Sequence, residues 1–296
     1  MDVQFYDDPA EFLAVAGPVL TADPVVGSVI ATNSQRIVRE RAAGVPKPTD
    51  RPFWWATVTD GADVIGAAMR TMPNPPHPMF VLPMPDEAAL LLVTTLLERG
   101  EHPGGCNGAL PAARVIADET VRLRGGTVAV AMHSRLFECR EVIPPKVPPG
   151  TLRPTGPADD DLVVEWCEAF GRDADEQGGR EPEPGNTRDP EAVRQRILAG
   201  RRFWLFLDSD GEPAHLTGVN PPAFGVSRIG PVYTPKSHRG RGIASHVVAE
   251  LTARGLAEGT RMCLFTDQAN PISNKIYEAI GYRAVVDMAN LKILPD

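Results

Sequence analysis

The stretch Ile229–Ala244 reads IGPVYTPKSHRGRGIA, and it decides how the rest of the chain is interpreted. It begins with a short apolar strand over Gly230–Thr234, passes through a polar loop that contains Gly240 and Gly242, and leads into a helix expected to begin near Ile243. Glycine has no Cβ, so a ligand can approach the backbone of such a loop closely. The N–H groups of the first helical turn, at the positive end of the helix dipole, favour an anion at this point.

Two arginines, Arg239 and Arg241, add positive charge to this loop. Strand, loop, helix N-terminus and arginines, here called the cradle (residues 230–245), together predict a pyrophosphate site. The sequence fits neither G-x-x-x-x-G-K-[ST] nor G-x-G-x-x-G, which excludes the two best-known phosphate loops. The alternative is an ordinary strand-to-helix turn with solvated arginines.

A second segment, Asn270–Tyr282, reads NPISNKIYEAIGY and predicts a short helix. Asn270 suits the N-cap, Pro271 the first helical position and Gly281 the position after the C-cap. The apolar residues expected to form the buried stripe are Ile272, Ile276, Ala279 and Ile280. Tyr277 lies beside that stripe.

The two segments, in this order, resemble the GNAT N-acetyltransferase superfamily. Arg239–Ala244 fits its R/Q-x-x-G-x-G/A loop, and Asn270–Tyr282 fits its pattern N-x-x-[A/S]-x-x-hydrophobic-Y-x-x-hydrophobic-G-[F/Y]. The resemblance implies an α/β protein of the α+β type, in which a mixed, mostly antiparallel twisted sheet is flanked by helices. It also implies an acyl-CoA-dependent N-acyltransferase that transfers acetyl from acetyl-CoA to a primary amine, directly and in a ternary complex.

The resemblance also assigns residues to the acyl-CoA site. The backbone of Val232, Tyr233 and Thr234 is implied to bind the pantetheine arm, while Asn270 and Ser273 flank its thioester end. The residues implied to surround the pyrophosphate are Arg239, Gly240, Arg241, Gly242, Ile243, Ala244 and Ser245.

Tyr277 matches the general acid of the superfamily, because a phenol with a pKa near 10 can protonate a leaving thiolate at neutral pH. Its alternative role is that of a core aromatic residue. No carboxylate stands on Ser227–Thr234, so the general base is open. His215 is one candidate, although a lone strand histidine is more often structural. Glu165 and Glu168 are others, and a chain of waters can replace a dedicated base.

Composition is that of an ordinary globular protein of 296 residues, 43% of them apolar and 23% charged. A net charge of −8 disfavours nucleic-acid binding, and the absence of a long apolar run disfavours a membrane span, so a cytoplasmic protein is expected. The cysteines Cys106, Cys139, Cys167 and Cys263 have neither metal-ligand nor disulfide spacing, and no metal is expected.

The chain is long enough for two domains, and its halves share landmarks. Each member of the pairs Phe53-Trp54 and Phe203-Trp204, Gly61 and Gly211, and Pro85 and Pro235 lies 150 residues from its counterpart. We therefore expect two GNAT-like domains in tandem, over residues 1–143 and 151–296, joined by a proline-rich linker over residues 144–150.

The first half differs where chemistry is expected. Asp86 and Glu87 follow Pro85 in place of the glycines and arginines, and Val121 stands where the second half has Tyr277. We expect a degenerate domain that serves as a scaffold, a substrate wall or a homodimer surface.

The acceptor is expected to be a small-molecule or peptide amine. A helix over Asp159–Phe170, an acidic loop over Gly171–Asp189 and a helix over Pro190–Ala199 favour a cationic amine, although a solvated acidic loop explains the same charges. The alternatives to an acetyltransferase are a non-catalytic acyl-CoA-binding regulatory or interaction protein and an acyltransferase with a longer acyl donor.

Overall fold

The computed structural model describes residues 1–180, 191, 194 and 202–296, and its contacts divide the chain into two compact units. The first unit comprises Met1–Leu136 and Val285–Asp296, and the second comprises Phe137–Ala284. These units differ from the division expected from the sequence in two respects. The break falls before the proline-rich segment 144–150, and the last twelve residues join the first unit.

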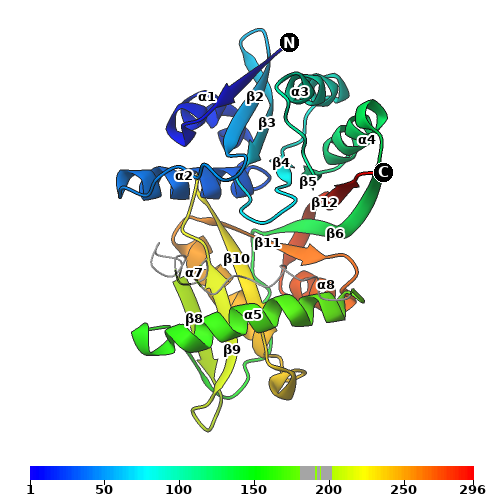
Figure 1. Ribbon diagram of the computed structural model, residues 1–296. Helices are drawn as coiled ribbons and strands as arrows, with labels where there is room; N and C mark the ends of the chain where they lie inside the picture. The colour runs from blue at the N-terminus through cyan, green and yellow to red at the C-terminus, as the bar shows by residue number, and fades with distance from the viewer. Residues whose placement is uncertain (181–190, 192–193, 195–201) are drawn as a thin grey trace. The chain divides into compact units, whose positions relative to one another are not determined.

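The first unit contains a mixed sheet with the strand order β1-β2-β3-β4-β5-β12 (Figure 1). All neighbouring pairs with a recorded register are antiparallel except β4 and β5. Its elements are β1 (Asp2–Tyr6), α1 (Pro9–Ala22), α2 (Ser28–Ala42), β2 (Trp54–Asp60), β3 (Asp63–Arg70), β4 (Met79–Val81), α3 (Asp86–Glu98), β5 (Gly105–Ala109), α4 (Ala112–Arg124) and most of β6 (Thr127–Cys139).

The second unit repeats this plan with the order β7-β8-β9-β10-β11, in which only β10 and β11 are recorded as parallel. Its elements are β7 (Thr151–Pro154), a 3-10 turn (Pro157–Asp159), α5 (Asp160–Gln177), β8 (Arg202–Leu207), β9 (Pro213–Val219), β10 (Val226–Tyr233), a 3-10 turn (Lys236–His238), α7 (Ile243–Ala257), β11 (Arg261–Asp267), α8 (Pro271–Ala279) and the start of β12 (Tyr282–Leu294).

The landmarks of the 150-residue repeat fall at corresponding places in the two units. Trp54 begins β2 and Trp204 lies in β8, while Pro85 and Pro235 follow β4 and β10 with nearly the same backbone angles. In both units the strand before this proline pairs in parallel with the strand that follows the next helix. The structure therefore agrees with the duplication expected from the sequence.

Two hydrophobic clusters hold the second unit together on opposite faces of its sheet. Val248 and Leu251 of α7 pack with Leu264 of β11 in one cluster, and Tyr277 of α8 joins them. On the other face, α5 crosses the strands (Figure 1) and packs Trp166 against Tyr233 of β10. The end of β10 is thus next to α5, which matters for the site.

The helix α5 is longer than expected, because it runs to Gln177 instead of ending at Phe170. The added segment Arg172–Gln177 contains good helix formers, and their propensity outweighs the single Gly171. Gly178 is the C-cap of the helix, and the next residue, Gly179, has a φ of +68°. The expected acidic loop beyond Arg180 lies outside the described residues, and so does the helix expected over Pro190–Ala199 apart from Glu191 and Arg194.

Candidate functional site

The strand expected to bind the pantetheine arm is β10. Toward its end it stops pairing with β11. Parallel pairing of β10 with β11 ends at Ile229↔Leu264, although β10 continues to Tyr233. On its other side β10 stays paired with β9 as far as Tyr233↔Leu216. The backbone around Val232 is therefore paired with β9 on one side, while its pairing with β11 on the other side does not extend past Ile229. An extended ligand can add to a sheet edge of this kind.

A β-bulge at the middle of β10 changes which face its side chains occupy. The register with β9 shifts between Ile229 and Val232. Without the extra residue, Ile229 and Tyr233 would point to the same face, because side chains alternate with period two. Instead Ile229 joins the cluster around α7, and Tyr233 joins the cluster under α5. The bulge therefore turns Tyr233 toward α5.

The loop after β10 has the open glycine backbone that the sequence predicts. Gly240 has a φ of +76° and Gly242 a φ of +78°. A Cβ built on either glycine would meet no other atom within 4 Å, so both backbones border open space. Gly242 is the N-cap of α7 and supplies no side-chain cap, which leaves the N–H groups of the first turn for a ligand. Of the three residues expected there, Ile243 is buried in the core, whereas Ala244 and Ser245 are half-buried.

Arg239 is engaged by the protein itself. Its Nη2 pairs with Oδ2 of Asp173 on α5 at 2.5 Å, and its Nε donates to the carbonyl oxygen of Thr234 at 2.9 Å. Two thirds of its side chain is removed from solvent. Arg239 therefore braces the loop from within, whereas Arg241 is exposed and donates to the carbonyl oxygen of Ser237 at 3.2 Å.

His215, which the sequence suggests as a candidate general base, instead holds the side chain of Thr234. Its ring nitrogens lie 2.7 Å from the hydroxyl oxygens of Thr234 and Thr217, and the residue is fully buried. Burial lowers the pKa of His215 to about 3. Because both nitrogens are engaged away from solvent, His215 is unsuited to taking a proton from an acceptor amine.

Asn270 caps α8 as the sequence predicts. Its Oδ1 accepts from the backbone N–H of Ser273 at 3.2 Å, and its Nδ2 donates to Gln177 of α5 at 2.9 Å. Asn270 is buried and Ser273 is half-buried. The predicted apolar stripe of α8 is wrong at two positions. Ile272 is 66% exposed and Ala279 is exposed as well, because this nine-residue helix buries chiefly Tyr277.

Tyr277 lies in the core of the second unit, 8% exposed, with its ring 6.0 Å from that of Tyr282 in an edge-on arrangement. Burial raises the pKa of the Tyr277 phenol above its ordinary value. The phenol therefore keeps its proton throughout the neutral range. This protonation state suits an acid and also suits a plain core tyrosine.

The acidic end of α5, expected as a wall for a cationic acceptor, is largely neutralised by the chain's own cations. Asp173 pairs with Arg239, Glu176 pairs with Lys236 at 2.6 Å, and Asp175 pairs with Arg180. Arg180 also pairs with Asp267 at the end of β11. These carboxylates therefore fasten α5 to the cradle and to β11. Sequence patterns do not show such pairings, because Asp173 and Arg239 are 66 residues apart.

In the first unit, the position that corresponds to Thr234 by the 150-residue offset is Met84. Its side chain is buried in the core of that unit against Gly66, where an added Cβ would lie 3.0 Å from the Met84 Cβ. Asp86 and Glu87 then begin α3. A packed side chain and two carboxylates thus stand where the second unit has its cradle.

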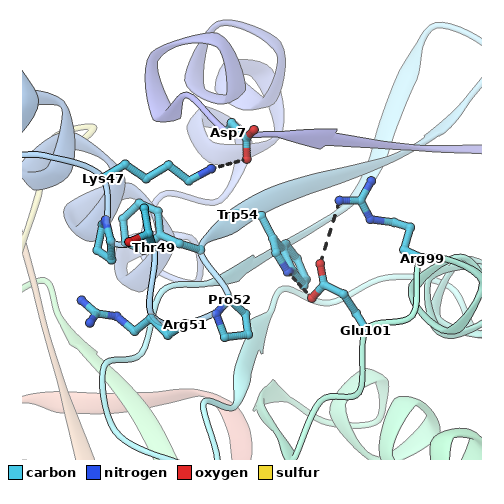
Figure 2. Close-up of a pocket in the computed structure, with 10 residues that line it drawn as sticks. Asp7, Lys47, Thr49, Arg51, Pro52, Trp54, Arg99 and Glu101 are labelled. Atoms are coloured by element: carbon cyan, nitrogen blue, oxygen red, sulfur yellow. Dashed lines mark hydrogen bonds and ion pairs between the residues drawn. The ribbon is translucent and has the colours of Figure 1, made fainter.

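The first unit has a separate hollow of about 450 Å³, lined by Asp7 after β1, by residues just before and at the start of β2, and by Arg99 and Glu101 after α3 (Figure 2). Its cations have partners in the hollow or beside it. Lys47 pairs with Asp7 at 2.7 Å, Arg51 pairs with the adjacent Asp50, and Arg99 lies 3.9 Å from Glu101. The Glu101 carboxylate also accepts from Trp54. These internal pairs give no reason to assign a ligand to the hollow.

A family model described as FR47-like protein matches residues 222–290, which include β10, the cradle and α8. No curated protein matches the chain. Over the described residues, no helix is long and apolar enough to cross a membrane.

Several solved structures match nearly the whole chain. A Drosophila protein matches with a TM-score of 0.68 and 13% identity over 99% of this chain and 98% of its own. A GCN5-related N-acetyltransferase from Sphaerobacter thermophilus matches with a TM-score of 0.61 and 17% identity, over 99% of this chain and 96% of its own. A tandem GNAT protein from the clavulanic acid biosynthesis pathway matches with a TM-score of 0.57 and 15% identity, over 98% of this chain and 97% of its own.

These likenesses confirm the predicted fold. The chain has an α+β fold shared with tandem GNAT structures over its full length, with an FR47-like region toward its C-terminal side. The fold that the two sequence motifs predicted is thereby confirmed, and the likeness to GNAT structures extends from residues 229–282 to the fold of the whole chain.

Proposed function

We propose that the chain is an acyl-CoA-dependent N-acyltransferase that transfers acetyl from acetyl-CoA to a primary amine, with its site in the second unit. One observation carries the proposal. β10 leaves β11 after Ile229 and leads into a loop whose Gly240 and Gly242 backbones border open space at the start of α7. This arrangement suits a ligand with an extended amide-containing arm and a pyrophosphate.

The donor would lie with its pantetheine arm along the open side of β10 at Val232–Thr234. Its pyrophosphate would meet the N–H groups of the loop and of the first turn of α7, with Arg241 exposed nearby. Arg239 would act indirectly, by keeping the loop in shape. Asn270 and Ser273 would lie toward the thioester end, where α8 begins.

The reaction would be direct. The neutral amine attacks the thioester carbonyl carbon, the carbonyl oxygen gains negative charge, and the C–S bond then breaks. A backbone N–H near Val232 would stabilise the oxyanion. Tyr277 would donate its phenolic proton to the departing sulfur and regain a proton from solvent, while the amine would lose its proton to solvent.

The proposal contains no dedicated protein base. His215 is locked between two hydroxyls, and Ser227–Thr234 carries no carboxylate. A water chain is sufficient for an amine whose pKa is close to neutral. Glu165 and Glu168 on α5 are the acidic side chains that a mutational search for a base should test first.

The acceptor proposed is a small-molecule or peptide amine. Asp173, Asp175 and Glu176 are paired within the protein, so the case for a cationic acceptor rests on the remaining acidic residues of α5, such as Glu165 and Glu168. A homodimer through the degenerate first unit is a further part of the proposal.

Calorimetric titration of acetyl-CoA tests the donor site. The Gly242→Trp variant should lose binding, because the indole would fill the open space beside the loop. Gly259→Trp is a matched control, since Gly259 has a φ of +76° and equally open surroundings after the end of α7. Binding that is lost in both variants, or kept in both, would contradict the assignment. Wild-type protein that binds neither acetyl-CoA nor longer acyl-CoAs would refute the proposed function.

A second candidate is a non-catalytic acyl-CoA-binding protein with regulatory or interaction roles. The locked His215 and the absence of a carboxylate on Ser227–Thr234 favour it. It shares the donor site with the enzyme but predicts no transfer to any amine.

A further inference from the structure

We propose that Asp173 is a positioning residue that, through Arg239, fixes the end of β10 and the cradle in the shape that binds the donor. This inference rests on the proposed function for the identity of the donor. It assigns a role to a residue of α5 that belongs neither to the loop motif nor to the α8 motif.

Asp173 is the anchor of a short chain of contacts that leads into the cradle. Its Oδ2 accepts from Arg239 at 2.5 Å, and from the Tyr233 hydroxyl at 3.4 Å. Arg239 in turn donates to the carbonyl oxygen of Thr234 at 2.9 Å. Only 15% of the Asp173 side chain is exposed, so solvent screens the ion pair weakly.

Thr234 is held at both of its polar ends by this arrangement. Arg239 holds its carbonyl oxygen, and the ring of His215 holds its hydroxyl oxygen. The peptide between Thr234 and Pro235 connects the strand edge to the loop, so its orientation sets where the following N–H groups point. Without Asp173, Arg239 would lose the partner that keeps its guanidinium turned toward Thr234.

Two further contacts make α5 a part of the proposed donor site. Trp166 of α5 packs edge-on against Tyr233 with ring centroids 5.8 Å apart, and Gln177 accepts from Asn270 at the start of α8. α5 therefore touches the end of β10 and the cap of α8, the two elements proposed to flank the acyl group. A change at Asp173 should reach the donor site without any direct contact with the donor.

The test compares Asp173→Ala with a control on the same helix. Glu176→Gln removes the pair of Glu176 with Lys236, whose side chains are 63% and 59% exposed, and exposed pairs contribute little. In ligand-free protein, amide hydrogen exchange over residues 234–243 should become about 10-fold faster in Asp173→Ala, because a charge-assisted hydrogen bond is lost. It should stay within about 2-fold of wild type in Glu176→Gln.

Acetyl-CoA binding gives the second readout. Its dissociation constant should rise about 10-fold in Asp173→Ala and change less than about 2-fold in Glu176→Gln. Asp173→Asn keeps an accepting oxygen and should lie between wild type and Asp173→Ala in both measurements. It also serves as the test variant if Asp173→Ala does not fold. The double variant Asp173→Ala/Arg239→Met should bind no more weakly than the weaker single variant, because both residues act through one contact chain.

The outcomes separate the two proposals. Unchanged exchange and unchanged affinity in the Asp173 variants would overturn the positioning role and leave the donor site standing. Wild-type protein without acyl-CoA affinity would remove the proposed function, and the exchange experiment on ligand-free protein would still decide whether Asp173 orders residues 234–243. A lowered melting temperature with unchanged exchange at those residues would also overturn the positioning role, because it would show a global effect.

Discussion

Glu138 at the end of β6 and Arg261 at the start of β11 form a bidentate ion pair between residues 123 positions apart. Nε of Arg261 lies 2.6 Å from Oε1 of Glu138, and Nη2 lies 3.0 Å from Oε2. The Glu138 side chain is 7% exposed. Burial alone would raise the pKa of Glu138, but the hydrogen bonds and charge of Arg261, together with Arg140, lower it overall.

Glu138→Gln should therefore destabilise the protein. Loss of a charge-assisted pair to a partly exposed arginine is expected to reduce the free energy of unfolding by about 1–2 kcal/mol, measured by denaturant titration. Because the folded-state pKa lies below the unfolded value, the wild-type advantage is present above pH ~4.3 and is lost as the pH falls further. Glu250→Gln on α7 breaks a pair with Arg254 whose side chains are 43% and 48% exposed, and it should have a much smaller effect. Equal effects of the two variants would contradict the importance of burial at Glu138.

His215 should make stability depend on pH in acid. The folded protein keeps His215 neutral down to a pKa of about 3, whereas the unfolded chain protonates it near pH 6.5. The free energy of unfolding should therefore fall as the pH drops from 6.5 toward 3, by up to about 1.4 kcal/mol per pH unit from this residue. His215→Gln should flatten that part of the curve, and the exposed His133→Gln should leave it unchanged. Parallel curves for wild type and His215→Gln would show that the imidazole is not held neutral.

Tyr277→Phe separates the enzyme from the binding protein. If the phenol protonates the leaving thiolate, the variant should lose transfer by roughly 100-fold and bind acetyl-CoA within about 3-fold of wild type. Since burial raises the pKa of Tyr277, the rate of the wild type should not fall near pH 9–10 through loss of this proton. An unchanged rate in Tyr277→Phe would remove the phenol from the mechanism.

The neighbouring Tyr282 gives the matched control. Its hydroxyl lies 2.7 Å from that of Thr252 in the core, so Tyr282→Phe should cost about 1 kcal/mol of unfolding free energy. Transfer activity should be nearly unchanged at a temperature where the variant is folded. A Tyr282→Phe variant that loses transfer as completely as Tyr277→Phe would mean that the effect at Tyr277 is one of packing.

Gly281, just after α8, should tolerate no side chain. Its φ is +108°, and an added Cβ would lie 2.2 Å from the carbonyl oxygen of Glu141. Gly281→Ala should therefore lower the unfolding free energy by at least about 2 kcal/mol more than Gly259→Ala, where φ is also positive but the space is open. Comparable melting temperatures for the two alanine variants would show that the backbone near Glu141 moves aside easily.

Elements with clear local signals could be predicted from the sequence. The helix α7 begins at Ile243, directly after Gly242, where the cradle motif predicts it. The strands β1, β5 and β7 were not foreseen. β5 reads GCNGA and has no apolar alternation, and its place in the sheet comes from its neighbours. Tertiary pairing decides such short segments.

At the site, the backbone features were predictable and the side-chain partners were not. The glycine loop and the Asn270 cap follow from local chemistry. The partner of Arg239, the burial of His215 and the turn of Tyr233 toward α5 depend on the β-bulge and on packing between distant segments. A residue such as Asp173 carries no sequence signal of its own, because one aspartate among many acidic neighbours has no distinctive spacing.

The assignment of Val285–Asp296 to the first unit affects the order in which the protein can be completed during synthesis. β12 pairs with β5 from Met288↔Ala109 to Lys292↔Gly105. When the ribosome has synthesised residues 1–136, β5 can pair with β4 on one side but still lacks β12, its partner on the other side. That partner emerges only after the entire second unit has been translated, so the unit encoded first is finished last.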